Sequence, residues 1–216
     1  MWMFLYIFAF VTLVHICTIV LKKETLRRIS KCLIIPPLLV AYIVGSGSPL
    51  LFVILALILG WLGDVLLIRI DRKKYFQLGL ASFLLGHICY IIVFFQGLSF
   101  FGSGINFPAI LIFAPPTFAL GAVVFRLIKP TKEMAVPVIV YMIVLVLMSL
   151  TGFQVFLVNP GVAGLLILSG CFNFMVSDTI LAYYTFRKLR LSGAVLIMAF
   201  YILAQAEIVI GLLLLG

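Results

Sequence analysis

The chain has 216 residues, of which 66% are hydrophobic and 10% are charged, and its mean hydropathy is +1.38. Because soluble domains carry about 25% charged residues, this composition is too apolar to cover a water-facing surface and excludes an ordinary soluble domain. The net charge of +9 would suit nucleic acid, but the positions of the basic residues favour a membrane protein with no nucleic-acid partner.

Eight apolar stretches follow one another along the chain, and about 20 such residues span a hydrocarbon core as a helix. The predicted spans are residues 2–21, 32–46, 50–68, 76–97, 108–127, 135–152, 161–186 and 192–215. The second is short and contains Pro36 and Pro37. We therefore predict an all-α fold, in which residues 1–216 form a single domain, a polytopic transmembrane helix bundle.

The fifteen basic residues predict how this bundle is oriented. They form four groups, between spans one and two, three and four, five and six, and seven and eight, and the loops at 46–49, 98–107 and 153–160 contain none. Because Lys and Arg concentrate in cytoplasmic loops, we expect the basic loops in the cytoplasm and both termini on the non-cytoplasmic side. The basic loops also suit anionic membrane lipids. In a bacterium the expected location is the inner (plasma) membrane.

Three acidic residues lie within the predicted spans, namely Asp64, Asp178 and Glu207. Charges are costly in hydrocarbon, so such residues usually face the bundle interior and mark functional sites. Asp64 and Asp178 lie about 6 and 12 Å from the cytoplasmic ends of their spans, at 1.5 Å per residue, and we expect them to converge on one pocket. Apart from Arg126, which lies next to the end of its span, no Lys or Arg falls inside a predicted span, so the two carboxyls must share a proton, accept hydrogen bonds from neutral donors or reach water.

Other readings of these acids stay open. Asp64 would also be accommodated by reaching the membrane interface near Arg69, and Asp178 by a hydrogen bond that only packs helices. Glu207, in the outer half of the last span, suits helix packing or a peripheral role at least as well as chemistry.

Further polar side chains recur at helical spacing in three spans. They are His87 and Tyr90 in span four, Asn173 and Ser177 in span seven, and Tyr201 and Gln205 in span eight. Each pair suits interhelical bonding, but together with the acids they indicate a polar cavity. Two histidines and four scattered cysteines without a CxxC pair do not suggest a metal site, so we expect neither metal nor organic cofactor.

Four motifs, in this order and in these spans, resemble the YhhN family of lysoplasmalogenase-like integral membrane proteins. They are Gly63-Asp64-Val65-Leu66-Leu67, Gly79-x3-Phe83-x3-His87-x2-Tyr90, Ser177-Asp178-x2-Leu181-Ala182 and Tyr201-x2-Ala204-Gln205. The resemblance covers nearly the whole chain, including, more weakly, Lys31 before the proline-bearing span.

The resemblance implies an intramembrane hydrolase that cleaves the vinyl ether bond of lysoplasmalogens to a fatty aldehyde and a glycerophospho-alcohol. The partner is then a lysophospholipid substrate, and Asp64 and Asp178 are the implied catalytic pair. Substrate and water would be held by His87, Tyr90, Asn173, Ser177, Tyr201 and Gln205, with Lys31 at the phosphate. The same acids suit a proton- or cation-coupled transporter or a lipid flippase, and a non-catalytic lipid-binding protein would use the polar residues only for helix packing.

Overall fold

The computed structural model describes residues 1–100, 104–187 and 191–216, apart from the side chains of residues 99, 100, 191 and 192. Over these residues the fold is helical: α1 (Trp2–Val20), α2 (Glu24–Cys32), α3 (Ile35–Gly45), α4 (Leu51–Leu66), the 3₁₀ turn η1 (Leu67–Arg69), α5 (Lys73–Phe100), α6 (Phe107–Ile128), α7 (Lys132–Val158), α8 (Val162–Arg187) and α9 (Leu191–Leu215). Contacts group them into two units, residues 1–93 with Gly216, and residues 94–215.

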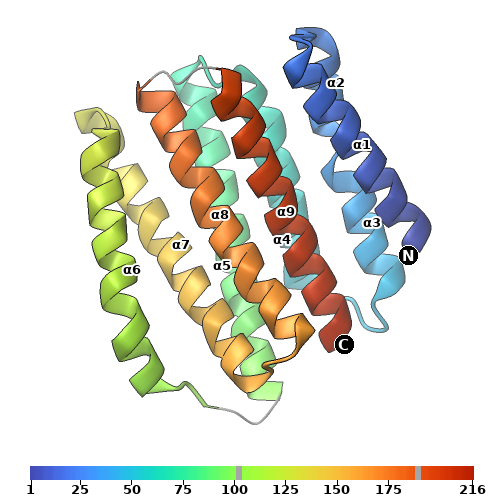
Figure 1. The fold of residues 1–216 in the computed structure, drawn as a ribbon, viewed down its shortest axis with the longest axis vertical. Helices are drawn as coiled ribbons and strands as arrows, with labels where there is room; N and C mark the ends of the chain where they lie inside the picture. The colour runs from blue at the N-terminus through green and yellow to red at the C-terminus, as the bar shows by residue number, and fades with distance from the viewer. Residues whose placement is uncertain (101–103, 188–190) are drawn as a thin grey trace. The chain divides into compact units, whose positions relative to one another are not determined.

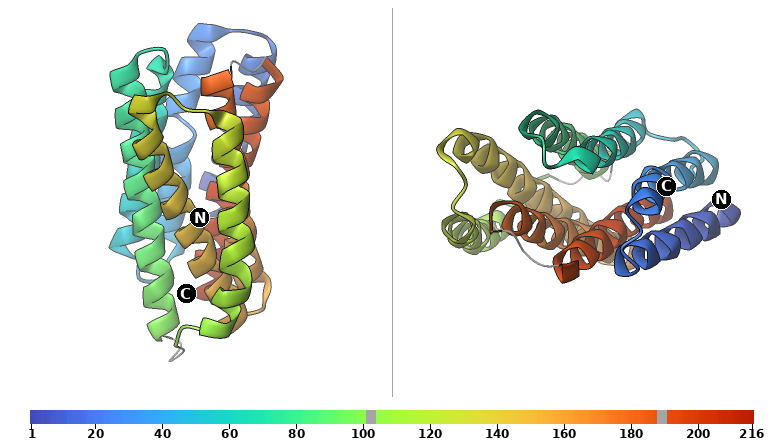
Figure 2. Two further views of the ribbon diagram at one scale, coloured as in Figure 1. Left: turned by 90° about the vertical axis from the view of Figure 1, so that its left-hand side faces the viewer. Right: turned by 90° about the horizontal axis from the view of Figure 1, so that it is seen from above.

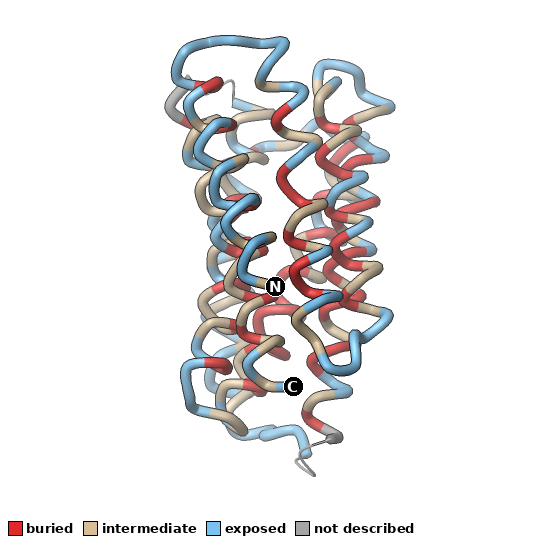
Figure 3. The backbone as a smooth tube through the Cα atoms, turned by 90° about the vertical axis from the view of Figure 1, so that its right-hand side faces the viewer, coloured by how far each residue is buried: buried red, intermediate tan, exposed pale blue. Residues whose placement is uncertain are grey.

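Among the described residues, eight helical segments are long and apolar enough to cross a bilayer, if α2 with α3 and α4 with η1 are each counted as one. Large apolar side chains such as Trp2, Phe10 and Leu111 are more than half exposed, as expected where lipid replaces water around a helix. Buried positions recur at intervals along the helices, between intermediate and exposed ones (Figure 3). The predicted all-α membrane fold and its number of spans are therefore confirmed.

The helix ends differ from the predicted spans. Helix α2 begins at Glu24, so Arg27, Arg28 and Lys31, which we expected in a loop, are helical. Helix α7 covers Lys132–Val158 and takes in most of the predicted loop at 153–160. A hydropathy window stops where polar side chains begin, whereas backbone hydrogen bonding continues through them. Pro36 and Pro37 lie in the first turn of α3, where a missing N–H breaks no helical bond.

The first unit contains α1 to α4, η1 and most of α5. Helices α1 and α3 lie side by side, with α2 joining them at one end (Figure 1). The indole Nε1 of Trp61 in α4 donates to the Cys32 carbonyl oxygen at 2.8 Å, which holds the end of α2 against α4. Ser82 Oγ of α5 donates to the Leu59 carbonyl oxygen of α4 at 2.6 Å.

The second unit contains the end of α5 and helices α6 to α9. Helices α8 and α9 pack along each other, and α6 lies at the margin of this unit beside α7 (Figures 1 and 2). Two glycines allow the close approach of α8 and α9, since a Cβ on Gly170 would lie 2.9 Å from the Ala204 carbonyl oxygen, and one on Gly211 would lie 2.8 Å from that of Ala163. Small residues at such contacts are a common basis of helix association in membranes.

We expect Gly170→Ala to destabilise the protein, although alanine is the better helix former by about 1 kcal/mol. The added Cβ would lie 2.6 Å from Ile208 Cγ1, and such overpacking costs about 1–3 kcal/mol. The measurement is thermal unfolding of the detergent-purified protein by circular dichroism. Gly97→Ala is the control, because no described atom beyond its chain neighbours and its own helix backbone lies within 4 Å of its Cβ position. A Gly170→Ala variant at least as stable as the wild type would refute the packing argument.

Candidate functional site

In the first unit, Asp64 lies close to the end of α4 and is 2% exposed. Its Oδ1 atom is 3.4 Å from Nζ of Lys31, whose side chain is 18% exposed. The prediction that no basic residue reaches the carboxyls within the spans is therefore wrong for Asp64. The guanidinium of Arg69, which marked the membrane interface in the alternative considered from the sequence, lies over the Tyr75 ring, 5.4 Å from its centroid.

The local sequence explains how Lys31 reaches this carboxyl. Lys31 is in the last turn of α2, before the helix stops and α3 begins at Ile35. The bond from Trp61 to the Cys32 carbonyl lies next to Lys31 in the chain. It anchors the end of α2 to α4, three residues before Asp64, and so brings the ammonium to the carboxylate.

Two of the family-like motifs meet in the first unit. A Cβ on Gly63 would lie 2.6 Å from Phe83 Cε2, so the Phe83 ring of α5 packs on the glycine that precedes Asp64. His87 and Tyr90 follow one and two turns later on α5 and are 2% and 1% exposed. The motif glycine thus permits the helix contact beside Asp64, and the two polar residues of α5 are buried.

In the second unit, Asp178 lies on α8 and accepts a hydrogen bond from the Tyr141 phenol of α7, with 2.5 Å between Oη and Oδ2. Tyr141 is 6% exposed. We did not single out Tyr141 from the sequence. The available signal was a phenol in the middle of an apolar span, because buried Tyr hydroxyls usually find a polar partner.

Two other candidate residues bond α8 to α9. Asn173 Nδ2 donates to Glu207 Oε2 at 2.7 Å, and Ser177 Oγ donates to the Ile197 carbonyl oxygen at 3.1 Å. Both contacts are of the interhelical kind considered for these residues, and the bond from Asn173 links Glu207 to α8, as the helix-packing alternative for Glu207 expects. Ser177 immediately precedes Asp178, so its bond also orients this part of α8.

The remaining pair from the sequence lies on α9. Gln205 Nε2 is 3.5 Å from Tyr201 Oη, one turn away, and both residues are buried. The Phe174 ring of α8 meets the Tyr201 ring edge-on, with 5.9 Å between the centroids. Tyr201 therefore lies at the contact of α9 with α8, the helix that carries Asp178.

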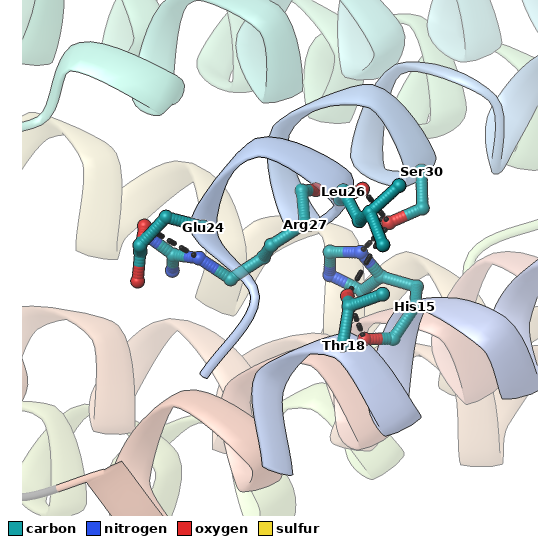
Figure 4. Close-up of polar contacts among 6 residues, drawn as sticks. All are labelled: His15, Thr18, Glu24, Leu26, Arg27 and Ser30. Atoms are coloured by element: carbon teal, nitrogen blue, oxygen red, sulfur yellow. Dashed lines mark hydrogen bonds and ion pairs between the residues drawn. The ribbon is translucent and has the colours of Figure 1, made fainter. Parts of the chain in front are cut away.

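No group of three or more His, Cys, Asp or Glu residues that could hold a metal ion occurs among the described residues. His15, the second histidine, takes part in a separate cluster in the first unit. Its Nδ1 atom is 2.9 Å from Ser30 Oγ, and Thr18 Oγ1 donates to its carbonyl oxygen at 2.7 Å (Figure 4). This cluster joins α1 to α2, the helix that carries Lys31.

In the part of the chain that the structure describes, eight helical segments are long and apolar enough to cross a membrane, and each of the two units holds a bonded carboxyl within such a segment. These are the features of a polytopic membrane protein with ionisable groups inside its spans. The YhhN family model matches residues 26–212, nearly the whole chain, and the chain belongs to that family. No curated protein and no solved structure matches it. The family inferred from the four motifs is thus confirmed.

Proposed function

We propose that this protein is an intramembrane hydrolase that cleaves the vinyl ether bond of lysoplasmalogens. The observation that carries the proposal is the chemical contrast between two carboxyls within the membrane spans of a YhhN-family chain. Asp64 is paired with the ammonium of Lys31, and Asp178 with the neutral phenol of Tyr141. Two carboxyl groups with different neighbours can hold different protonation states, so that one can act as the acid and the other as the base of one reaction.

The bond chemistry defines what these groups must do. A proton is added to the vinyl carbon remote from the ether oxygen, and the remaining carbon becomes part of an oxocarbenium ion. Water adds to that carbon and gives up one proton to a base, which forms a hemiacetal. The hemiacetal loses the glycerophospho-alcohol and becomes a fatty aldehyde. One water is consumed, and the acid and the base end in their starting forms after proton exchange.

We assign the acid to Asp178 and the base to Asp64. Lys31 gives Asp64 a positively charged neighbour, which is the setting expected for an ionised carboxylate, and an ionised carboxylate can stabilise a cation and take a proton from water. Tyr141 holds Asp178 by a hydrogen bond and orients it as proton donor. In this scheme Lys31 positions Asp64, in place of the phosphate contact expected from the sequence.

The other buried polar residues complete the proposal. Four of them are buried, namely His87 and Tyr90 on α5 and Tyr201 and Gln205 on α9. We assign them the positioning of water and of the lipid head. Asn173 and Ser177 support α8 through their bonds to α9.

The test is aldehyde release from a lysoplasmalogen by the detergent-purified protein. We expect aldehyde and glycerophospho-alcohol in equal amounts, and no cleavage of the matching lysolipid with a saturated ether, which has no double bond to protonate. If folded protein releases no aldehyde, the hydrolase proposal fails. Proton or cation flux through the same protein in liposomes would then favour a transporter.

A further inference from the structure

We propose that the second unit binds an anionic phospholipid of the bilayer between α6 and α7, with a hydrocarbon chain in an apolar groove and the phosphate on Arg126. This site is separate from the residues assigned to hydrolysis, and it does not depend on the proposed reaction.

A partly open groove of about 280 Å³ lies between these two helices. Its lining includes Phe118 and Val146 towards one end, and Arg126 and Ile139 towards the other. Phe118 and Arg126 are eight positions apart, which corresponds to about 12 Å along the helix axis. The groove therefore runs along the helix axis from an apolar end to a charged one, which is the polarity of a lipid chain with its head group.

The packing of α6 explains why this groove is open. None of the most apolar part of α6 is buried. Gly121, at the α6–α7 contact, has no side chain to fill the space, and a Cβ there would lie 3.6 Å from Met142 Cε. Exposed apolar surface in a membrane protein faces lipid. A lipid chain in this groove would contact both α6 and α7, whereas a chain on a single exposed helix contacts only that helix.

The charged end of the groove favours a lipid with a net negative charge. Lys129 ends α6 in a left-handed conformation, with φ 48°, and Lys132 begins α7. Arg187 of α8 is also held at this end, because its Nε donates to the Leu127 carbonyl oxygen at 3.0 Å. A guanidinium binds phosphate oxygens bidentately, and each nearby Lys or Arg adds about 1 kcal/mol of attraction to anionic lipids.

A second groove in the same unit serves as an internal contrast. It has a volume of about 480 Å³ and lies between α6, α7 and α8, with Thr117 and Thr179 as the polar residues of its lining. A hydrocarbon chain would fit there as well, but none of the charged side chains that the structure describes lines this groove to hold a phosphate. The combination of groove and guanidinium therefore singles out the site at Arg126.

The proposal predicts lipid binding that depends on both charge and groove shape. Purified protein is titrated in detergent with phosphatidylglycerol or with phosphatidylcholine of the same chains, and bound lipid is counted by native mass spectrometry. We expect preferential retention of phosphatidylglycerol and about a tenfold or greater loss of binding in Arg126→Gln. Lys74→Gln removes the same charge from an exposed position of α5 and is expected to change binding less than about twofold.

Groove shape is tested by adding bulk on the exposed face of α6. Ala122 lines the groove and its exposed neighbour Val123 does not, so Ala122→Trp should reduce binding and Val123→Trp should leave it unchanged. Glycerol phosphate in excess should not displace the lipid. Equal binding of the two lipids, equal losses in Arg126→Gln and Lys74→Gln, or equal effects of the two tryptophans would overturn the proposal.

Discussion

Replacing Asp178 with asparagine is expected to reduce aldehyde release by about 10²–10⁴-fold, the contribution typical of a general acid. The amide keeps the size of the side chain, and its oxygen can still accept the hydrogen bond from Tyr141, whose Oη lies 2.5 Å from Oδ2 of Asp178. It has no acidic proton to give to the vinyl carbon. The measurement is the initial rate of aldehyde release by purified protein, with circular dichroism and gel filtration to verify the fold.

Two further variants make this experiment specific. Glu207→Gln alters another acid within the spans, one that accepts a hydrogen bond from Asn173; it should keep its rate within about twofold. Tyr141→Phe retains the Asp178 carboxyl but removes its hydrogen bond, and we expect an intermediate rate. A folded Asp178→Asn protein with the wild-type rate would remove Asp178 from the mechanism.

Replacing Lys31 with methionine is expected to destabilise the fold by about 3 kcal/mol, because removing one partner of a buried ion pair leaves the other charge uncompensated. The measurement is the free energy of unfolding in detergent. Asp64 is 2% exposed and Lys31 lies 3.4 Å from it. The double variant Lys31→Met with Asp64→Asn should recover most of the lost stability, since neither charge is then present.

Arg27→Met is the matched control on the same helix. Arg27 pairs with Glu24 at 2.7 Å, but this pair is largely exposed, and such pairs contribute at most about 1 kcal/mol. Equal losses of stability in Lys31→Met and Arg27→Met, or no recovery in the double variant, would show that the Lys31–Asp64 pair contributes no more to stability than an exposed ion pair. The double variant, although its stability recovers, is expected to release no aldehyde, which separates the catalytic role of Asp64 from its structural one.

The apolar spans were predictable because the bilayer restricts the backbone of a spanning segment to a regular, fully hydrogen-bonded structure. Every N–H and C=O group in hydrocarbon must be bonded within its own segment or barrel, so a run of about 20 apolar residues implies a helix. The ends of the helices were less predictable from the sequence. Glu24 and Val158 are helical, although both fall outside the apolar windows, since helical bonding does not require apolar side chains.

Asp64 and Asp178 could be selected from the sequence alone, because an acid in an apolar span is costly and therefore conspicuous. Their partners could not. Lys31 precedes Asp64 by 33 residues in the numbering, and Tyr141 is separated from Asp178 by 37. Which side chains meet depends on how each helix is rotated and how closely its neighbours approach, as where the Phe83 ring packs on Gly63.

Composition and hydropathy by themselves determined the class of fold, the number of spans and the unusual acidic residues within them. Each of these depends on the free-energy cost of placing individual residues in lipid, which the sequence gives directly. Tertiary structure alone decided that Lys31 pairs with Asp64, that Tyr141 bonds to Asp178, and that Asn173 and Ser177 join α8 to α9. Those contacts depend on steric fit between helices, which no single stretch of the chain encodes.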